Sequence, residues 1–420
     1  MSHTDVTPRP RIVALTQAGG AFRPRPARRR TAALAAVAAV AVALCLPASA
    51  PARSLPFGFF GVSADSAYFV LPKAVQRTEQ NVMVQSGVES MRLVINWGVS
   101  QPYQDFSQVP RRKRSQFINI GGIPTNLSEP DRLIAAAASR GLRVLPVVVD
   151  SPPWASANPI KEGAEPRDIG AYAQFVSVLV RRYGPHGTFW AGHHAPAKVR
   201  IRQWQIWNEP DLPFQWTNQA RNFAPRYVEL LRESRAAIKA LDPGGQVVLA
   251  GMTSSLTWPR VWDAFQAIYD AGGRGLFDIA AVHPYTREPR NVLKILNRVH
   301  AVMSRNGDGD LPMAVTEFGW SSRLGHARHP ISWEVTPAKQ ARNLSQIYRL
   351  FVANRRRLHI VSTYWYTWMS NDLTPYWASW TGLRRRTRKH GTDKPALAAF
   401  RRVTRRGEGC RKRRLATRCG

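Results

Sequence analysis

The sequence predicts an α/β fold, a single (β/α)8 barrel domain with long loops after its strands. Eight short apolar segments alternate with eight amphipathic segments between residues 55 and 402. Such alternation is typical of parallel strands that are joined by crossover helices. The long connections follow the apolar segments, as they do on the functional face of a barrel. The length also fits, because a barrel can reach about 250 residues or more as one domain.

The composition excludes several other classes of protein. Hydrophobic residues make up 44% of the chain and aromatic residues 10%, which excludes a disordered chain. The 29 Gly and 31 Pro show no triplet period, and three Cys are too few for a disulfide-rich scaffold. An open, doubly wound sheet is the structural alternative. It lacks support, because no G-x-G-x-x-G motif follows the first apolar segment.

The expected strands are apolar, rich in β-branched and aromatic residues, and bounded by Gly or Pro. In chain order they cover residues 57–62, 91–96, 142–149, 199–207, 246–251, 277–283, 311–317 and 359–366. The expected helices cover residues 72–86, 128–140, 168–183, 224–241, 259–272, 290–305, 337–355 and 394–403. The seventh helix shows the pattern well, because Leu344 and Phe351 fall on one face. Thr336 and Pro337 supply its N-cap and first position.

The N-terminal segment predicts export. Arg28, Arg29 and Arg30 precede an apolar run over 32–46, and small residues follow it up to Ala52. This order is typical of a secretory signal peptide, which we place over residues 1–52. We therefore expect a secreted or cell-surface protein. The run is shorter than the about 20 residues of a membrane span, but an uncleaved signal anchor stays open.

The net charge of +33 is concentrated at the two ends of the chain. Residues 1–53 carry eight Arg against one Asp, and residues 384–420 carry fifteen Lys and Arg against two acidic residues. The remaining 37 basic and 24 acidic residues give the middle a net charge of +13. A nucleic-acid protein would need its basic residues along a cleft, so we expect no specific nucleic-acid partner.

The domain boundaries follow from these observations. We expect the barrel over residues 53–403 and a basic, disordered tail over residues 404–420. Such a tail can meet an anionic cell-wall polymer or a membrane surface by charge. Cys410 and Cys419 lie in it. Spacing alone leaves open whether these two residues form a disulfide or stay free thiols.

Two glutamates carry the functional prediction. The expected fourth strand ends in Trp207-Asn208-Glu209-Pro210, and the seventh ends in Thr316-Glu317. Because each Glu stands where a strand turns into a loop, both lie on the same rim of the barrel. Cleavage of a glycosidic bond requires two such carboxyl groups. One donates a proton to the leaving oxygen, and the other attacks or stabilises the anomeric carbon.

These motifs resemble clan A of the glycoside hydrolases, the retaining (β/α)8 enzymes with catalytic residues on strands four and seven. Within this clan, the motifs resemble those of families 5 and 39 most. The resemblance covers the expected barrel from its first strand to its eighth. The resemblance implies that Glu209 is the acid/base and Glu317 the nucleophile. It implies that Asn208 holds the sugar's 2-hydroxyl group. It implies no cofactor and no metal ion.

Other positions resemble the clan as well. Met91-Arg92-Leu93 resembles its second strand, which implies that Arg92 keeps the nucleophile ionised. The sequence Val282-His283-Pro284-Tyr285 resembles its sixth strand, which implies that His283 and Tyr285 contact substrate and nucleophile.

The positions of the tryptophans also indicate a carbohydrate site. Eleven of the 14 Trp lie in or beside the loops after strands. A flat apolar ring with a polar N–H group suits the face of a sugar. The resemblance implies a sugar platform on the eighth strand, and we favour Trp368 over Trp365 because Trp368 lies nearer the mouth. Trp97 and Trp154 are further candidates, since the loop before Trp154 resembles a cleft loop of family 39.

Together these features predict a secreted, retaining glycoside hydrolase that acts by double displacement. We expect a monomer with a carbohydrate substrate. Retention requires the two carboxyl groups to lie about 5–5.5 Å apart. Two alternatives stay open: a transglycosylase that uses the same residues, and a cell-wall barrel that binds carbohydrate without catalysis.

Overall fold

The computed structural model describes residues 55–64, 66–193, 195–216, 222–253, 260–326, 331–387 and 390–408. The expected signal peptide and Cys410 and Cys419 lie outside the described residues. Among the described helices, none has both the length and the apolar character that crossing a membrane requires.

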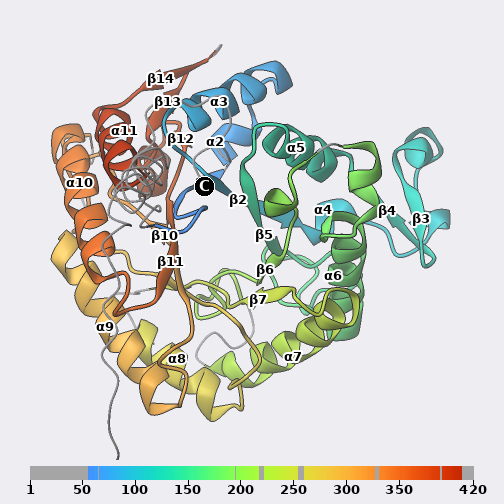
Figure 1. The fold of residues 1–420 in the computed structure, drawn as a ribbon. Helices are drawn as coiled ribbons and strands as arrows, with labels where there is room; N and C mark the ends of the chain where they lie inside the picture. Colours follow the sequence, from blue (N-terminus) through green and yellow to red (C-terminus); the bar gives the residue numbers. More distant parts are fainter. Residues whose placement is uncertain are drawn as a thin grey trace, which may run out of the picture. The chain divides into compact units, whose positions relative to one another are not determined.

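A curved parallel sheet forms the centre of the molecule, and helices surround it (Figure 1). The strand order is β7-β6-β5-β2-β1-β11-β10-β9-β8. The bounds of these strands are β1 Phe60–Ala64, β2 Ser90–Asn96, β5 Arg143–Val149, β6 Gln203–Ile206, β7 Gln246–Val248, β8 Met252–Thr253, β9 Ala280–His283, β10 Met313–Phe318 and β11 Ile360–Trp365. The predicted (β/α)8 fold class is confirmed.

The barrel closes through one interrupted strand. β7 pairs with β6 and β8 pairs with β9, and only residues 249–251 separate β7 from β8. The backbone groups of this break find other partners, as buried polar groups must. Leu249 N donates to Ile279 O (2.9 Å), and Ala250 N donates to the Tyr227 hydroxyl (2.6 Å). β7 and β8 are thus two pieces of the fifth barrel strand.

Eight helices follow the barrel strands, and each lies close to its predicted range. Their bounds are α3 Lys73–Gln85, α5 Ser128–Ala138, α6 Ile169–Tyr183, α7 Ala224–Leu241, α8 Val261–Asp270, α9 Pro289–Arg305, α10 Pro337–Asn354 and α11 Pro395–Glu408. The predicted cap of α10 is confirmed, because the Thr336 hydroxyl accepts a hydrogen bond from Lys339 N (3.2 Å). α10 also packs against α11, as the contacts of Tyr348 with Phe400 show (ring centroids 5.7 Å apart).

Smaller elements decorate the loops. They are α2 Ser66–Phe69, α4 Trp97–Ser100, the hairpin of β3 Ile118–Ile120 and β4 Ile123–Thr125, the three-stranded sheet of β12 Met369–Ser370, β13 Arg384–Arg386 and β14 Gly391–Asp393, and 3-10 turns at Phe106–Gln108, Arg111–Gln116, Thr188–Gly192, Ala197–Val199 and Trp377–Trp380.

The C-terminal helix extends past the expected end of the barrel at residue 403. α11 continues to Glu408, and Thr404 is buried there, where its hydroxyl donates to Ser86 O (3.0 Å). The helix continues because its apolar face packs on the body of the barrel, with Phe400 against Phe60. The folded part of the described chain therefore reaches Glu408.

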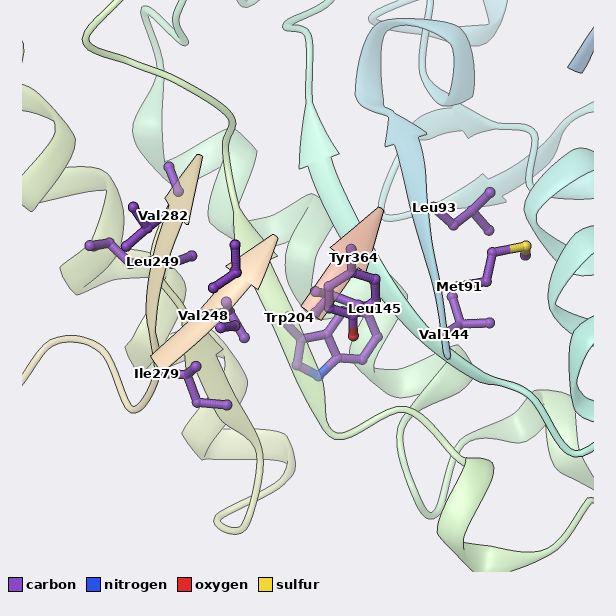
Figure 2. Close-up of a cluster of buried hydrophobic side chains, with 14 of the residues drawn as sticks. Met91, Leu93, Val144, Leu145, Trp204, Val248, Leu249, Ile279, Val282 and Tyr364 are labelled. Atoms are coloured by element: carbon purple, nitrogen blue, oxygen red, sulfur yellow. The ribbon is translucent and has the colours of Figure 1, made fainter. Parts of the chain in front are cut away.

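Alternation along the strands separates the core from the cavity. In β2, Met91, Leu93 and Ile95 are buried in the hydrophobic core, whereas Arg92 and Val94 line a cavity. Side chains of a strand point to opposite faces in turn, so one face packs under the helices and the other faces the barrel interior. Figure 2 shows part of this core, formed by apolar side chains such as Met91, Leu93 and Val248.

Candidate active site

A cavity of about 590 Å³ lies at the carboxyl ends of the barrel strands. This is the face of a parallel barrel on which active sites are built. Its lining residues come from nearly every strand or the loop behind it: Ser63, Ala64, Arg92, Val94, Val149, Asp150, Asn208, Glu209, Leu212, Phe214, Gln215, Thr253, Tyr285, Glu317, Trp333, Tyr366, Tyr376, Trp377 and Ala378.

The turn after β6 places Glu209 at this cavity through an unusual backbone. Trp207 has φ 68° and Glu209 has φ 43°, a region that residues other than Gly seldom adopt. The ring of Trp207 anchors the turn, because it is fully buried and packs edge-on against Trp216. Its indole N–H donates to Gln215 O (2.8 Å). Trp207 is therefore a packing residue that fixes the position of Glu209.

Glu317, in β10, is held as a carboxylate. The Arg92 guanidinium donates from Nη1 to Oε1 (2.6 Å), and the Tyr285 hydroxyl donates to Oε2 (2.7 Å). Burial alone would raise the pKa of Glu317, but His283, Arg92 and the Tyr285 hydrogen bond outweigh it, so the pKa is lowered. The ionised form suits a nucleophile.

Glu209 has the opposite environment. Burial raises its pKa above the ordinary value, and the negative charge of Glu317 adds to this, although His283 opposes it. His283 is completely buried, and its Nδ1 lies 2.7 Å from Glu209 Oε1. Its other nitrogen, Nε2, lies 2.9 Å from the Thr316 hydroxyl. His283 thus fixes the orientation of Glu209 and is itself fixed at both ring nitrogens.

A glycine makes room for this histidine. Gly251 lies in the break between β7 and β8, and a Cβ atom at this position would overlap the imidazole of His283. The imidazole of His283 therefore packs directly against the backbone at Gly251, inside the break of the fifth barrel strand. Glycine is required at this position for space and not for its backbone conformation, because the φ angle of Gly251 lies outside the left-handed region.

Arg92 uses three donor groups to connect Glu317 with β6 and with Asn208, the residue before Glu209. Besides Glu317, it donates from Nη2 to Asn208 Oδ1 (2.6 Å) and from Nε to Gln205 Oε1 (2.7 Å). Because the oxygen of the Asn208 amide accepts this bond, its nitrogen is the group that can donate to a ligand in the cavity.

The two carboxyl groups lie close together. One oxygen of Glu209, one oxygen of Glu317 and a ring nitrogen of His283 all lie within 4.8 Å of one another. Such a set could coordinate a metal ion, but it also suits two carboxyl groups acting on one bond. Retaining glycosidases hold these groups about 5–5.5 Å apart, and inverting ones about 6.5–9.5 Å.

The tryptophans expected to contact substrate lie elsewhere. None of Trp97, Trp154 and Trp368 lines the cavity, which corrects the expectation from the sequence. Trp368 is fully buried and its N–H donates to Glu79 Oε2 (3.0 Å). Trp97 is also fully buried, and its N–H donates to Gln101 Oε1 (2.7 Å). Both rings pack loops onto the barrel, and so does Trp154. Its ring packs edge-on against Trp97, and its N–H donates to Gln101 O (2.8 Å).

Trp365, the alternative platform, is buried as well, and Tyr366 lines the cavity instead. Neighbouring residues at the end of a strand point in opposite directions, so Trp365 faces away from the barrel interior. Its N–H donates to Thr381 O (2.9 Å). The ring of Tyr366 lies edge-on to Tyr285, with centroids 6.4 Å apart.

Other aromatic rings of the cavity come from the long loops. Trp377 lies edge-on to both Tyr285 (5.3 Å) and Trp333 (5.7 Å), and together they form one wall. Tyr376 and Phe214 line the cavity and are more than half exposed. Loop tryptophans were a signal in the sequence, but nothing in it indicates which rings turn inward.

The chain is a (β/α)8 barrel with two glutamates at the cavity on the carboxyl ends of its strands. No family model and no curated protein sequence matches the chain. Solved structures do match in fold. A monomeric β-xylosidase from Caulobacter crescentus shares 16% identity at a TM-score of 0.57, over 83% of this chain and 69% of that one.

Two further structures extend the comparison. A family 39 glycoside hydrolase from Bacteroides cellulosilyticus shares 18% identity (TM-score 0.57), over 84% of this chain and 64% of that one. A family 51 α-L-arabinofuranosidase from Bifidobacterium longum shares 14% identity (TM-score 0.56), over 86% and 75%. The chain thus spans about two thirds of the length of the first two structures. Families 39 and 51 both belong to clan A, so the resemblance to this clan holds at the level of the fold.

Proposed function

We propose that the protein is a retaining O-glycoside hydrolase that acts by double displacement through Glu209 and Glu317. One observation carries the proposal. Two buried glutamates approach within 4.8 Å at one cavity, and their surroundings shift their pKa values in opposite directions. A carboxylate beside a carboxylic acid is the arrangement that this reaction needs.

In the first step, the Glu317 carboxylate attacks the anomeric carbon while Glu209 gives its proton to the leaving oxygen. The glycosidic C–O bond breaks, and an ester joins the sugar to Glu317. In the second step, Glu209 takes a proton from water, whose oxygen attacks the same carbon. The ester bond to Glu317 breaks, free sugar leaves, and both glutamates return to their starting states.

The neighbours of the two glutamates support each step. Arg92 and Tyr285 hold Glu317 in place by hydrogen bonds of 2.6 and 2.7 Å, which positions it for attack. His283 holds Glu209 at 2.7 Å. The amide nitrogen of Asn208 is available for a sugar hydroxyl. The aromatic wall formed by Trp333 and Trp377 suits the apolar face of a sugar ring.

Export and surface contact belong to the same proposal. Residues 1–52 would direct the enzyme out of the cell, and the basic residues at the C-terminus would contact an anionic polymer or membrane surface. The substrate is then a carbohydrate outside the cell.

A panel of 2,4-dinitrophenyl glycosides tests the activity directly. We expect the wild-type protein to hydrolyse at least one of the xyloside, glucoside, mannoside and arabinofuranoside. Glu317→Gln should reduce this hydrolysis to the background rate, because the amide cannot attack. Asp310→Asn, on a fully exposed side chain, is the control and should keep the wild-type rate. Wild-type turnover by Glu317→Gln would overturn the assignment.

The products separate hydrolysis from transfer. With a high concentration of an added sugar acceptor, a hydrolase releases free sugar, whereas a transglycosylase yields a longer glycoside from the same Glu209 and Glu317.

A further inference from the structure

A third carboxyl group faces the cavity. Asp150 directly follows β5 and lines the cavity together with Glu209 and Glu317. Its backbone adopts φ 63°, a left-handed conformation that Asp tolerates better than most residues. Its carbonyl oxygen accepts a hydrogen bond from Gly98 N (2.8 Å), which fixes the turn. The mechanism above gives Asp150 no task.

One oxygen of this carboxyl group is held by the protein. Asn96 Nδ2 donates to Asp150 Oδ2 (2.7 Å). The orientation of the Asn96 amide is determined by its own position, because Asn96 caps α4 and its Oδ1 accepts from Val99 N (2.8 Å). Asn96 therefore presents its amide nitrogen to Asp150.

The other oxygen has no such partner. Among the described residues, none donates a hydrogen bond to Oδ1 of Asp150, and none forms an ion pair with its carboxyl group. Burial, with a smaller contribution from Glu162, raises the pKa of Asp150 to about 6. A half-buried carboxylate without a cation costs stability, so its place at a cavity points to a ligand that donates hydrogen bonds.

Strand order places Asp150 across the cavity from the nucleophile. β5 and β10 are four strands apart in this barrel of eight strand positions, and Glu317 lies in β10. A sugar whose anomeric carbon faces Glu317 directs the far side of its ring toward β5. We propose that Asp150 is a substrate-binding residue whose carboxylate accepts a hydrogen bond from a ring hydroxyl group far from the anomeric carbon.

This role rests on the proposed glycosidase function, and it narrows the substrate class. An acidic sugar would meet the negative charge of Asp150, so the site favours a neutral sugar. Discrimination between neutral sugars would come from the hydroxyl group that Asp150 contacts. A site built to bind a hydroxyl group rejects an analogue that lacks it.

The test uses the dinitrophenyl glycoside that the wild-type protein hydrolyses fastest, together with its monodeoxy analogues. Asp150→Ala should lower kcat/KM about 10- to 100-fold, the range that a hydrogen bond to a charged group supplies. One deoxy analogue should already be a poor substrate for the wild-type protein. The substitution should cause no further loss with that analogue, while the other analogues lose as much as the parent compound.

Asp150→Asn separates binding from a structural role. The amide oxygen of the new side chain can still accept from Asn96, so the turn is kept. If Asp150 only holds the turn, Asp150→Asn should equal the wild-type protein in KM and kcat. If it binds substrate, Asp150→Asn should raise KM on the parent glycoside and leave the melting temperature unchanged. Asp310→Asn is again the control.

Two results would overturn the proposal in different ways. An active wild-type protein together with unchanged kinetics of Asp150→Asn would overturn the role of Asp150 alone. No turnover of any glycoside by the wild-type protein would overturn the proposed function and this inference with it.

Discussion

At the scale of single residues, Glu209 and Glu317 show how neighbours divide two roles between identical side chains. Both are buried at the same cavity. Burial raises the pKa of Glu209 and would raise that of Glu317 too, but the latter has Arg92 and Tyr285 as direct hydrogen-bond donors. The different roles of the two glutamates therefore depend on two donors to Glu317: Arg92 in β2 and Tyr285 in the loop after β9.

This division predicts the pH dependence of activity. Turnover needs Glu317 ionised and Glu209 protonated, so kcat/KM should fall at low pH as Glu317 gains a proton. It should fall again at higher pH as Glu209 loses one. Tyr285→Phe removes a hydrogen bond to the ionised form of Glu317, so its pKa should rise and the acid limb should move to higher pH. The measurement is kcat/KM against pH.

Tyr364→Phe is the matched control for this substitution. Tyr364 is also buried and hydrogen-bonded through its hydroxyl group, to Ser90 at the other end of the barrel (2.8 Å). Its removal should leave the acid limb in place. If the acid limb of the pH profile stays in place in Tyr285→Phe, Tyr285 does not help to keep Glu317 ionised.

The sequence allowed some site residues to be predicted because strand ends determine them. Glu209, Glu317, Arg92 and Tyr285 all line the cavity. The prediction that Trp97, Trp154 and Trp368 line the cavity was wrong for a physical reason. Whether an aromatic ring of a long loop faces the cavity or packs the loop depends on tertiary contacts, such as the hydrogen bond of Trp368 to Glu79. No periodicity encodes these contacts.

At the scale of elements, the alternation of strands and helices could be predicted from the sequence, whereas the residues at which they begin and end were predicted less accurately. α7 begins and ends at the predicted residues 224 and 241. β6 is shorter than expected, because a 3-10 turn over Ala197–Val199 occupies the start of the predicted strand. The break between β7 and β8 could not be predicted, since its backbone groups bind partners far away in the sequence, such as Tyr227.

The break carries a functional consequence through Gly251. Gly251→Ala would press a methyl group against the His283 ring and so move it away from Glu209. We expect kcat/KM to fall at least about tenfold, and stability to fall by about 1–3 kcal/mol, the usual cost of overpacking. Kinetics and a urea titration measure the two effects.

Gly192→Ala is the control for this change, because a Cβ atom at Gly192 meets open space. This variant should match the wild-type protein in both measurements. Wild-type kcat/KM in Gly251→Ala would contradict the view that the position of His283 matters for turnover.

At the scale of the whole molecule, the charge of +33 separates into folded and terminal parts. Part of the basic C-terminal region is folded, because Arg384 pairs with Glu79 (2.8 Å) and Lys394 pairs with Asp372 (3.1 Å). α11 then continues to Glu408. Five Lys and Arg lie beyond it, in residues 409–420. Of the basic residues in the C-terminal region, only these five can be removed without cutting into α11.

Truncation after Glu408 therefore tests the proposed surface contact. We expect unchanged glycosidase activity and an unchanged melting temperature. Retention on immobilised poly-L-glutamate at low salt should decrease, since attraction between exposed charges is screened by salt. A full-length variant with the five basic residues changed to Gln should behave in the same way. Equal retention of all three proteins would exclude a role of these charges.

The central claim is that Glu317 forms a covalent bond with the sugar. The direct measurement is mass spectrometry of the protein after incubation with a 2,4-dinitrophenyl 2-deoxy-2-fluoroglycoside of the preferred sugar, which slows the second step. The account predicts an added mass of one fluorosugar, located on the peptide that contains Glu317. It predicts no such adduct in Glu317→Gln. A label on another residue, or a protein that turns over substrate without forming any adduct, would contradict it.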